Sequence, residues 1–463
     1  MQTTEVHVMT DTAAGSWAAA ELAGADLGDA RLNRRLVRVA EQWGAQPSAS
    51  IPVACGGWAE TQAAYRLLAH ENVDWESVLA PHWDGSVERM RAHRVVLCIQ
   101  DTTELNFTSQ PGIGGLGPLS YLRQHGLYVH PTLAVTPDGV PLGVLDAWLW
   151  ARDRKTFGDD KRHWPIEAKE SMRWLEGFER CAELAATLPD TRLVYIADRE
   201  CDIHEFMVRA GRWPGIDWLI RASHNRCLAE GDKLWDRLAQ GAVLGEVRFI
   251  LPARPGRPSR PVVLTVRAER VTLQPRGGEA VTVTALRARE ESPPADVEPL
   301  DWRLLTNRPA DTLAQAAELL QWYATRWSIE VFFRIFKTGC RVEALQLSTL
   351  ERLEPALALY LIIAWRIQYL TLLGRATPDL PCDAVLDPAE WQAVYVAIHH
   401  RPPPVTPPPL PVMLRWIARL GGHLGRKHDG PPGPKALWIG LQRARDLAWG
   451  MQLASEIHSQ STG

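Results

Sequence analysis

One segment, Trp322–Lys337, constrains the fold of this chain more than any other. At about 100° per residue, as in an α-helix, its polar side chains share one narrow stripe and nearly every other direction is apolar. The stripe consists of Tyr323, Arg326, Glu330, Arg334 and Lys337. A helix that is apolar nearly all round belongs inside a protein, where charged groups need partners. The segment predicts either an internal ladder of ion pairs around Glu330, or a carboxylate that holds a metal beside groups that grip a phosphate backbone.

Length and composition bound the class of protein. A chain of 463 residues predicts two to four domains, and 46% hydrophobic with 23% charged residues is typical of a globular protein. The N-terminus lacks a secretion signal and no run of 18 apolar residues occurs, so we expect a cytoplasmic protein without a membrane partner. Seven scattered cysteines without CxxC spacing indicate neither a disulfide framework nor a zinc site. A net charge of −3 neither indicates nor excludes a nucleic-acid partner.

Residues 1–75 are predicted to form a small helical domain. Helices are expected over Trp17–Leu27, Ala30–Trp43 and Glu60–Ala69, the second of them capped by Asp29. On that second helix, arginines share one face with no acid between them: Arg31, Arg34, Arg35 and Arg38. Such a face is either solvated or suited to a DNA backbone or groove.

Residues 90–350 are predicted to form an α/β domain with a mixed sheet and helices packed on it. The expected strands are Arg94–Gln100, Tyr128–Val135, Val140–Trp150, Arg192–Ala197, Trp218–Ala222 and Trp302–Asn307, and the expected helices are Pro165–Leu188 and Cys201–Ala210. Between about 225 and 300 the pattern changes to short antiparallel strands, which predicts an inserted β subdomain. They are Val247–Leu251, Val262–Val266, Arg270–Leu273 and Ala280–Leu286. The loop at 251–261 carries Arg254, Arg257 and Arg260, and is either a linker or a nucleic-acid contact.

Residues 351–463 are predicted to be helical, with Leu353–Leu373, Pro388–His399, Leu410–Leu420 and Lys435–Leu453 as the expected helices. Strongly apolar helices at a chain end close the core or form a partner interface.

Three carboxylates come from separate elements. Two strands predicted to be buried deliver Asp101 and Asp198 at their ends, and the segment described first presents Glu330. An Asp at a strand end often only caps the next helix. Three converging carboxylates, however, favour Mg²⁺ or Mn²⁺, and a pair of such ions supports phosphodiester cleavage and transfer.

Several motifs resemble those of DDE transposases. They are Asp198-Arg-Glu-Cys-Asp-Ile-His204 and the spacing Tyr323-x2-Arg326-x3-Glu330-x6-Lys337, which is similar to the YREK signature of the insertion sequence 4 family. Leu27-Gly-Asp-Ala-Arg-Leu and Thr61-Gln-Ala-Ala-Tyr-Arg resemble its N-terminal DNA-binding domain, and Asp101-Thr-Thr resembles its first acidic motif. Ile417–Gly422 and Leu437-Trp438 resemble its C-terminal dimerisation region.

The resemblance implies an RNase H-like catalytic domain in which Asp101, Asp198 and Glu330 hold Mg²⁺ or Mn²⁺, two ions per site. It also implies contacts with DNA from Arg199, Arg221, Trp302, Tyr323, Arg326 and Lys337. Trp302 would stack on a flipped base, although a core tryptophan fits the same position.

The implied reaction is cleavage at the ends of an insertion sequence, hairpin formation and strand transfer into target DNA. A homodimer would hold the paired ends, in the bacterial cytoplasm and at the nucleoid. Two alternatives remain: a transposase-derived DNA-binding regulator that does not cut, and a nuclease of the same fold with no joining step.

Overall fold

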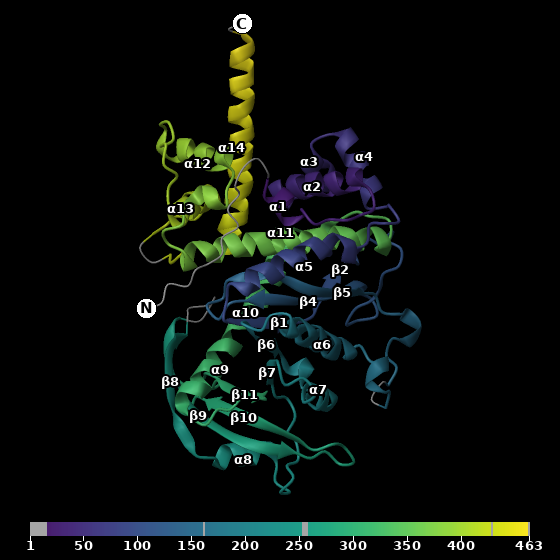
Figure 1. The fold of residues 1–463 in the computed structure, drawn as a ribbon, viewed down its shortest axis with the longest axis vertical. Coiled ribbons are helices and arrows are strands. Elements are labelled where there is room, and N and C mark those ends of the chain that lie inside the picture. The colour runs from purple at the N-terminus through teal and green to yellow at the C-terminus, as the bar shows by residue number, and fades with distance from the viewer. Residues whose placement is uncertain (1–15, 161–162, 252–257, 427–428, 462–463) are drawn as a thin grey trace. The chain divides into compact units, whose positions relative to one another are not determined.

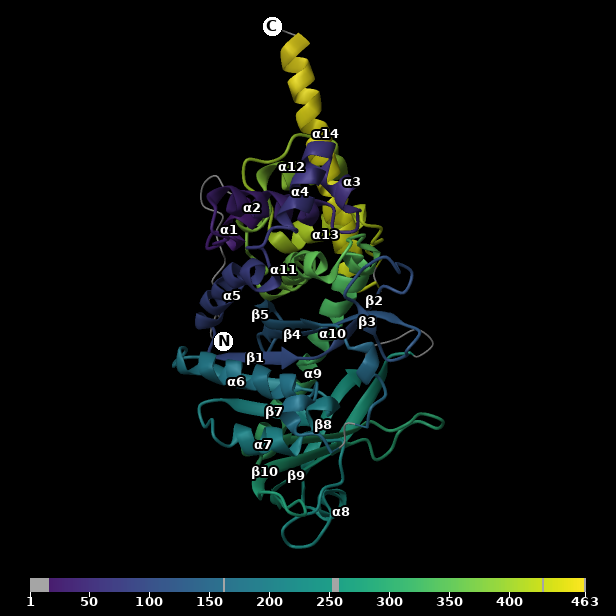
Figure 2. The same ribbon diagram turned by 90° about the vertical axis from the view of Figure 1, so that its right-hand side faces the viewer.

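The computed structural model describes residues 16–160, 163–251, 258–426 and 429–461. The chain divides into two compact units, drawn in Figure 1 and Figure 2. The first unit comprises residues 1–93, 102–159 and 328–463, and the second comprises residues 94–101 and 160–327. The division into domains at 1–75, 90–350 and 351–463 stays a prediction.

The second unit is built on a mixed sheet, as the sequence predicted. Its strand order is β1-β6-β7-β11-β10-β9-β8. β1, β6 and β7 run parallel, and the remaining pairs are antiparallel. Their bounds are β1 Val95–Gln100, β6 Arg192–Ala197, β7 Asp217–Arg221, β8 Val243–Leu251, β9 Arg260–Leu273, β10 Val281–Arg289 and β11 Asp301–Thr306.

The antiparallel strands predicted as an insertion are present and continue the same sheet, because β10 pairs with β11. The two short strands expected between 262 and 273 are one long strand, β9. In the basic loop, Arg254 and Arg257 lie outside the described residues. Arg260 lies at the start of β9 and pairs with the buried Glu290 at 2.9 Å. This ion pair joins β9 to the residue that follows β10, so Arg260 stabilises the sheet.

Helices of the second unit cover the sheet through a buried aromatic cluster. Phe178 contacts Tyr195 and Phe206, and Phe206 contacts Trp218, with ring centroids 5.2–5.6 Å apart. The helices are α6 Met172–Ala186, α7 His204–Ala210, α8 Leu234–Gln240 and α9 Leu313–Thr325. α6 begins later than the predicted Pro165, because residues 166–168 form a separate 3₁₀ turn.

The first unit contains the predicted hairpin. β4 pairs antiparallel with β5, and also with β2 and β3. Two helices, α5 and α11, pack on β5 and on each other (Figure 1). The bounds are β2 Thr103–Asn106, β3 Gly117–Pro118, β4 His125–Val135, β5 Pro141–Trp150, α5 Trp75–Arg91 and α11 Leu350–Ala376.

The first unit also contains helices that precede α5 and helices on either side of α11 in the sequence. They are α1 Trp17–Glu21, α2 Ala30–Ala45, α3 Ile51–Cys55, α4 Trp58–Leu67, α10 Trp327–Arg334 (all but its first residue), α12 Pro388–His399, α13 Leu410–Leu420 and α14 Pro434–Ser461. The bounds predicted for α12 and α13 are confirmed. α1 is shorter than predicted, and α3 and α5 were not predicted.

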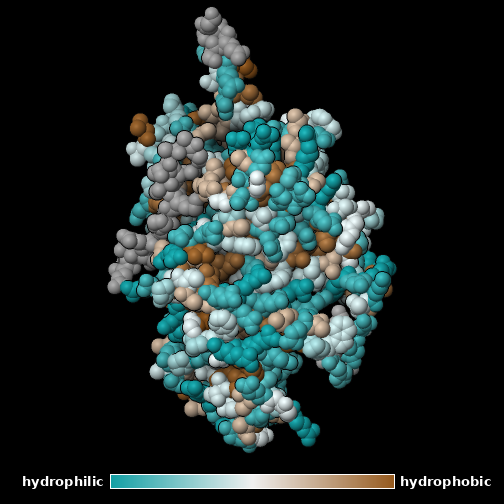
Figure 3. Space-filling model, turned by 45° about the vertical axis from the view of Figure 1, so that its right-hand side comes forward, coloured by the Kyte–Doolittle hydropathy of each residue, from teal (hydrophilic) through white to brown (hydrophobic). Residues whose placement is uncertain are grey.

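Two C-terminal helices differ in burial. Among the described residues, α11 is long and apolar enough to cross a membrane, but 89% of the qualifying window is buried in the protein, as in a core helix. α14 extends beyond α12 and α13 (Figure 1), and hydrophobic residues lie among hydrophilic ones along it (Figure 3). Its exposed apolar side chains are Leu447, Trp449, Met451 and Ile457.

A buried charged network joins α1 to α5 and β5. Arg89 donates to both carboxylate oxygens of Glu21, at 3.0 and 2.9 Å, and to the Leu142 carbonyl. His82 hydrogen-bonds Glu21 through Nδ1, and its Nε2 accepts the Val144 N–H at 2.9 Å. Because Nε2 is an acceptor, the proton must lie on Nδ1, and the imidazole is neutral. The charge of Glu21 is therefore balanced by Arg89.

We expect Glu21→Gln to lower the free energy of unfolding by about 3–5 kcal/mol, because Arg89 would keep a buried charge without a counter-charge. Urea unfolding followed by tryptophan fluorescence measures it. Glu88→Gln is the matched control: Glu88 pairs with Arg91 at 3.1 Å on the exposed side of α5, and its loss should cost less than about 1 kcal/mol. Equal losses for both variants would contradict the role of the network.

The same network predicts acid sensitivity. Burial raises the pKa of the Glu21 carboxyl, but the interactions with His82 and Arg89 outweigh burial and lower the pKa from 4.5 to about 2. Since the folded pKa is the lower one, the stabilisation is present above pH 4.5 and is lost as the pH falls towards 2. This loss lowers the free energy of unfolding by about 3 kcal/mol. In Glu21→Gln, the free energy of unfolding should therefore fall by about 3 kcal/mol less over the same pH range.

Candidate active site

Two of the predicted acids lie level at one edge of the sheet. β1 and β6 are parallel neighbours whose register pairs Ile99 with Ile196. Asp101 and Asp198 each follow two residues later, so both lie just beyond the carboxyl ends of their strands. The strand-end arrangement predicted from the sequence is confirmed for this pair.

A third strand brings a cation to the same edge. β7 runs parallel to β6, and its register pairs Ile220 with Ala197. Arg221 therefore lies level with Asp198, at the end of the neighbouring strand. A strand, and not a loop, therefore supplies this cation at the strand end next to Asp198.

Asp101 has an arginine partner. Its carboxylate is nearly buried, and Oδ2 accepts a hydrogen bond from Nη1 of Arg326 at 2.7 Å. Arg326 follows the last residue of α9 and closes that helix as its C-cap. An arginine that the sequence assigned to DNA therefore also balances the charge of a predicted metal ligand.

Asp198 also acts as a cap. Oδ1 accepts the Glu200 N–H at 2.8 Å, at the start of the 3₁₀ turn that runs from Arg199 to Cys201. The alternative role given for a strand-end Asp, that of capping the next helix, is thus confirmed for Asp198. One hydrogen bond leaves acceptor capacity on a carboxylate, which has about four lone-pair sites, so capping and metal binding are compatible.

Cations and a buried tyrosine surround these acids within the second unit. Burial lowers the pKa of Arg221, as do the neighbouring charges of Arg199 and Arg326, while Tyr323 partly offsets them. Burial also raises the pKa of the Tyr323 hydroxyl, against the effect of Arg326 and Arg221. Trp302 packs edge-on against Tyr323, with ring centroids 5.9 Å apart. The structure thus brings together five of the six residues that the resemblance assigned to DNA.

The sequence predicted one continuous helix for the segment that carries Glu330, but the structure interrupts this helix. α9 ends at Thr325, α10 covers Trp327–Arg334, and residues 335–339 form a π-helical turn in which the Cys340 N–H bonds to the Ile335 carbonyl at 2.8 Å. The hydrogen bonding is tighter at Arg326, whose N–H bonds to the Tyr323 carbonyl at 3.1 Å, and wider in the π-helical turn after Arg334. Trp327, expected on the apolar side, is 55% exposed.

Glu330 and Lys337 fold with the first unit. Glu330 lies half-buried in the first turn of α10. Lys337 donates to the carbonyl of Glu104 at 2.6 Å and lies 3.7 Å from the carboxylate of Glu343. Within the described residues, no group of three or more Asp, Glu, His or Cys side chains is placed to hold a metal ion. The chemistry of the acids, oxygen donors at a strand edge, still fits a hard divalent cation.

The basic face of α2 is present but is not free of acid. Asp29 caps α2 as predicted, accepting the Arg31 N–H at 2.7 Å. Arg31, Arg34 and Arg38 are exposed, and Arg35 is half-buried. Glu60, on α4, pairs with Arg35 and Arg38. No acid lies between the arginines of α2, as the sequence indicated, but Glu60, 22 residues after Arg38, reaches the face through folding.

A second acid of the Asp198–His204 motif has a positioning role that the sequence did not reveal. The side chain of Asp202 is fully buried and accepts the N–H groups of Ser223 and His224, at 2.7 and 2.8 Å. It also binds the guanidinium of Arg226 at 2.5 Å. These bonds fix the loop that directly follows Arg221. The only sequence signal was that the motif contains a second Asp.

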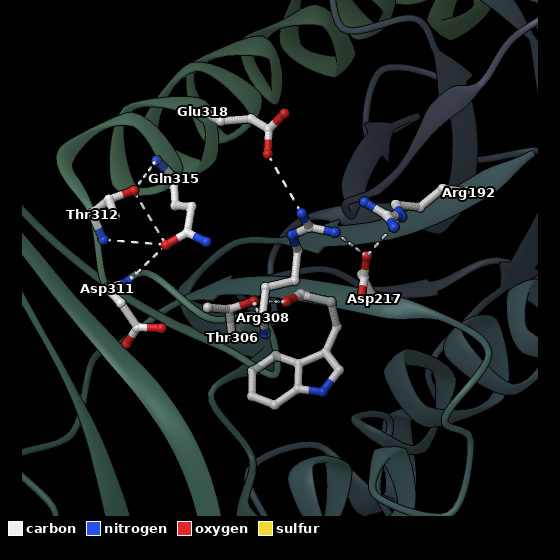
Figure 4. Close-up of polar contacts among 9 residues, drawn as sticks. Arg192, Asp217, Thr306, Arg308, Asp311, Thr312, Gln315 and Glu318 are labelled. Carbon is white, nitrogen blue, oxygen red and sulfur yellow. Dashed lines mark hydrogen bonds and ion pairs between the residues drawn. The ribbon is translucent and has the colours of Figure 1, made fainter.

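The junction between β11 and α9 is fixed by a second set of contacts (Figure 4). Arg308 bonds Asp217 of β7 at 2.6 Å, and its guanidinium lies 5.0 Å from the ring centroid of Trp322. Thr312 caps the start of α9 in a reciprocal capping box. α9 is therefore held at both ends, which orients Tyr323 and Arg326.

Comparison with protein families gives three matches along the chain. Residues 14–73 match a family model described as transposase DNA-binding, and residues 179–366 match a transposase DDE domain. Residues 362–461 match the transposase Tn5 dimerisation domain. Asp198 and Glu330 lie within the DDE match and Asp101 precedes it. The mixed sheet with helical regions at both chain ends fits an RNase H-like transposase.

We expect Asp202→Asn to lower the free energy of unfolding by about 1.5–3 kcal/mol, because hydrogen bonds to a buried charge are lost. Hydrogen exchange at the Ser223 and His224 amides should accelerate with it. Asp232→Asn is the control: Asp232 pairs with Arg237 at 2.8 Å but is exposed, and its loss should cost less than about 1 kcal/mol. Unchanged exchange at both amides would contradict the positioning role.

Proposed function

The chain belongs to the DDE transposases, and we propose that it cuts and joins DNA at the ends of an insertion sequence of the YREK branch. As a DDE transposase it is a metal-dependent polynucleotidyl transferase, and its matched domains support DNA binding and dimerisation. The observation that carries the proposal is the pair of acids, Asp101 and Asp198, level at one sheet edge beside Arg221 and Arg326.

We propose that Asp101, Asp198 and Glu330 bind divalent cations, Mg²⁺ or Mn²⁺, two per site. Such ions supply an activated water or hydroxyl and stabilise the leaving oxygen. The contact between Asp101 and Arg326 supports this, because it shows that the carboxylate of Asp101 already accepts a hydrogen bond from a cationic group. Glu330 follows Arg326 by only four residues, so their Cα atoms are separated by at most about 14 Å.

The surrounding side chains are proposed to hold the DNA strand. Arg199, Arg221 and Arg326 would bind phosphates near the scissile bond, because guanidinium groups match phosphate geometry. The Tyr323 hydroxyl keeps its proton at neutral pH, since its pKa is raised, and can donate to a phosphate oxygen. Trp302, half-exposed beside Tyr323, would stack on a flipped base, and Lys337 would bind a phosphate farther along.

The proposed sequence of reactions begins with cleavage of one strand at each end. The freed 3′-hydroxyl then attacks the opposite strand to form a hairpin, the hairpin is reopened, and the end is joined to target DNA. A homodimer acting on paired ends in the bacterial cytoplasm, at the nucleoid, would carry out these reactions. The most direct test incubates the full chain and Mg²⁺ with a duplex of the inverted repeat that flanks the coding region. Nicks, hairpins and joined products support the proposal. Binding without nicking favours the DNA-binding regulator, and nicks without joining favour a nuclease.

We expect Glu330→Gln to retain DNA-end binding and to lose nicking by more than the roughly 10- to 100-fold that loss of an outer-shell partner costs. Gel assays of nicking and of binding measure the two effects separately. Glu351→Gln makes the same change at an exposed acid at the start of α11 and should leave nicking unchanged. Normal nicking by Glu330→Gln would exclude that acid as a ligand.

We expect Arg34→Ala combined with Arg35→Ala to weaken end binding and to flatten its salt dependence. Each lost phosphate contact removes about 0.9 from the slope of log K against log salt. Fluorescence anisotropy across a salt series gives affinity and slope together. The matched control is Arg91→Ala with Arg94→Ala, two exposed arginines outside α2. An unchanged slope in the α2 variant would remove this face from the DNA-binding surface.

A further inference from the structure

One acid is held by three donors of the α2 face. Oε2 of Glu60 accepts from Nη1 of Arg35 at 2.6 Å and from Nε of Arg38 at 2.9 Å. The side-chain amide of Gln42 donates to the same oxygen at 3.4 Å. The three donors lie on successive turns of α2, whereas Glu60 comes from α4. A single oxygen is therefore surrounded by the groups that point out of this face.

This arrangement has the chemistry of a phosphate-oxygen site. Guanidinium groups bind a carboxylate and a phosphate with the same donors and similar geometry. The pair is also within reach of solvent, because the side chains of Glu60, Arg35 and Arg38 are 28%, 30% and 58% exposed. A DNA phosphate can therefore approach these donors only in competition with the carboxylate.

The carboxylate of Glu60 is ionised at neutral pH. Partial burial raises its pKa, but the hydrogen bond from Arg38 and the charges of Arg35 and Arg38 outweigh burial, so the pKa lies below its usual value. The acid is thus a permanent anion among the arginines of α2, in the position that a bound anion would occupy.

We propose that Glu60 is a built-in competitor of the DNA phosphate, which occupies Arg35 and Arg38 and lowers the affinity of the α2 face for DNA. The inference rests on the proposed function, in which this face binds DNA. Arg31 and Arg34 remain exposed for a first contact. A phosphate can contact Arg35 and Arg38 only if it displaces the carboxylate of Glu60. A duplex that fits the domain poorly displaces it less often and therefore makes fewer phosphate contacts.

The opposite role would be a buttress, in which Glu60 holds the two arginines in the conformation that DNA needs. The two roles differ in sign. Removal of a competitor strengthens binding, whereas removal of a buttress weakens it. Glu60→Gln removes the charge and keeps the shape, and Glu60→Ala removes both, so the competitor role predicts stronger binding for both variants.

The test measures binding of the full chain to an inverted-repeat duplex and to a scrambled duplex by fluorescence anisotropy, between about 50 and 200 mM salt. For Glu60→Gln and Glu60→Ala we expect at least a fivefold gain in affinity for both duplexes, with a slope steeper by about one phosphate contact. The gain should be larger for the scrambled duplex. Glu71→Gln, the same charge change at an exposed acid in the loop after α4, should give less than a twofold gain.

The outcomes separate the competitor role from the proposed function. If Arg34→Ala with Arg35→Ala weakens binding but neither Glu60 variant exceeds Glu71→Gln, the face binds DNA and the competitor role is wrong. If Glu60→Ala weakens binding, Glu60 is a buttress of the two arginines and the competitor role is wrong. If the arginine variant has no effect either, the face itself is not a DNA site, and this part of the proposed function fails as well.

Discussion

The parallel hydrogen bonding of β1 to β6 is the constraint on which the rest of the active site depends. Every residue of these strands except the first of each is buried, so their register is set by apolar packing on both faces. A slip of one residue would offset the two strand ends by about 3.3 Å and turn one acid to the opposite face. The level placement of Asp101 and Asp198 is thus a consequence of burial several residues earlier.

The second feature of the site is a group of arginines gathered near the two acids. Burial lowers the pKa of Arg221, and the neighbouring charges of Arg199 and Arg326 lower it further. Like charges that lie close together are typical of functional sites. A polyanionic strand would relieve the repulsion among the arginines, and divalent cations would relieve that between the acids.

Much of this fold could be predicted from the sequence, because burial leaves a pattern. The apolar run at 192–197 gives β6 with its observed bounds, and the helix predicted at 388–399 is α12. α5 was missed because it contains Pro81 and lacks a continuous apolar stripe. The resemblance supplied candidate residues at positions where spacing alone left two interpretations open.

The remaining parts of the site could not be predicted, because they depend on contacts between residues far apart in the sequence. Nothing near Glu60 indicates that it meets Arg35, and nothing near Glu21 indicates that it meets Arg89. The buried role of Asp202 depends on a loop about twenty residues later. An ion pair between distant elements has no periodic signature, so sequence patterns cannot distinguish it from two solvated charges.

The segment at 322–337 could be predicted from the sequence only in part. Its spacing suggested one helical stripe, whereas the structure interrupts the helix at Arg326 and again after Arg334. Each interruption adjoins an anchored residue: Arg326 bonds Asp101, and Lys337 bonds the carbonyl of Glu104, three residues farther along the chain. Arg326 is thus anchored within the second unit and Lys337 within the first. Glu330 lies in the sequence between these two anchored residues, and such anchoring would favour the preorganisation that the proposed metal-assisted catalysis needs.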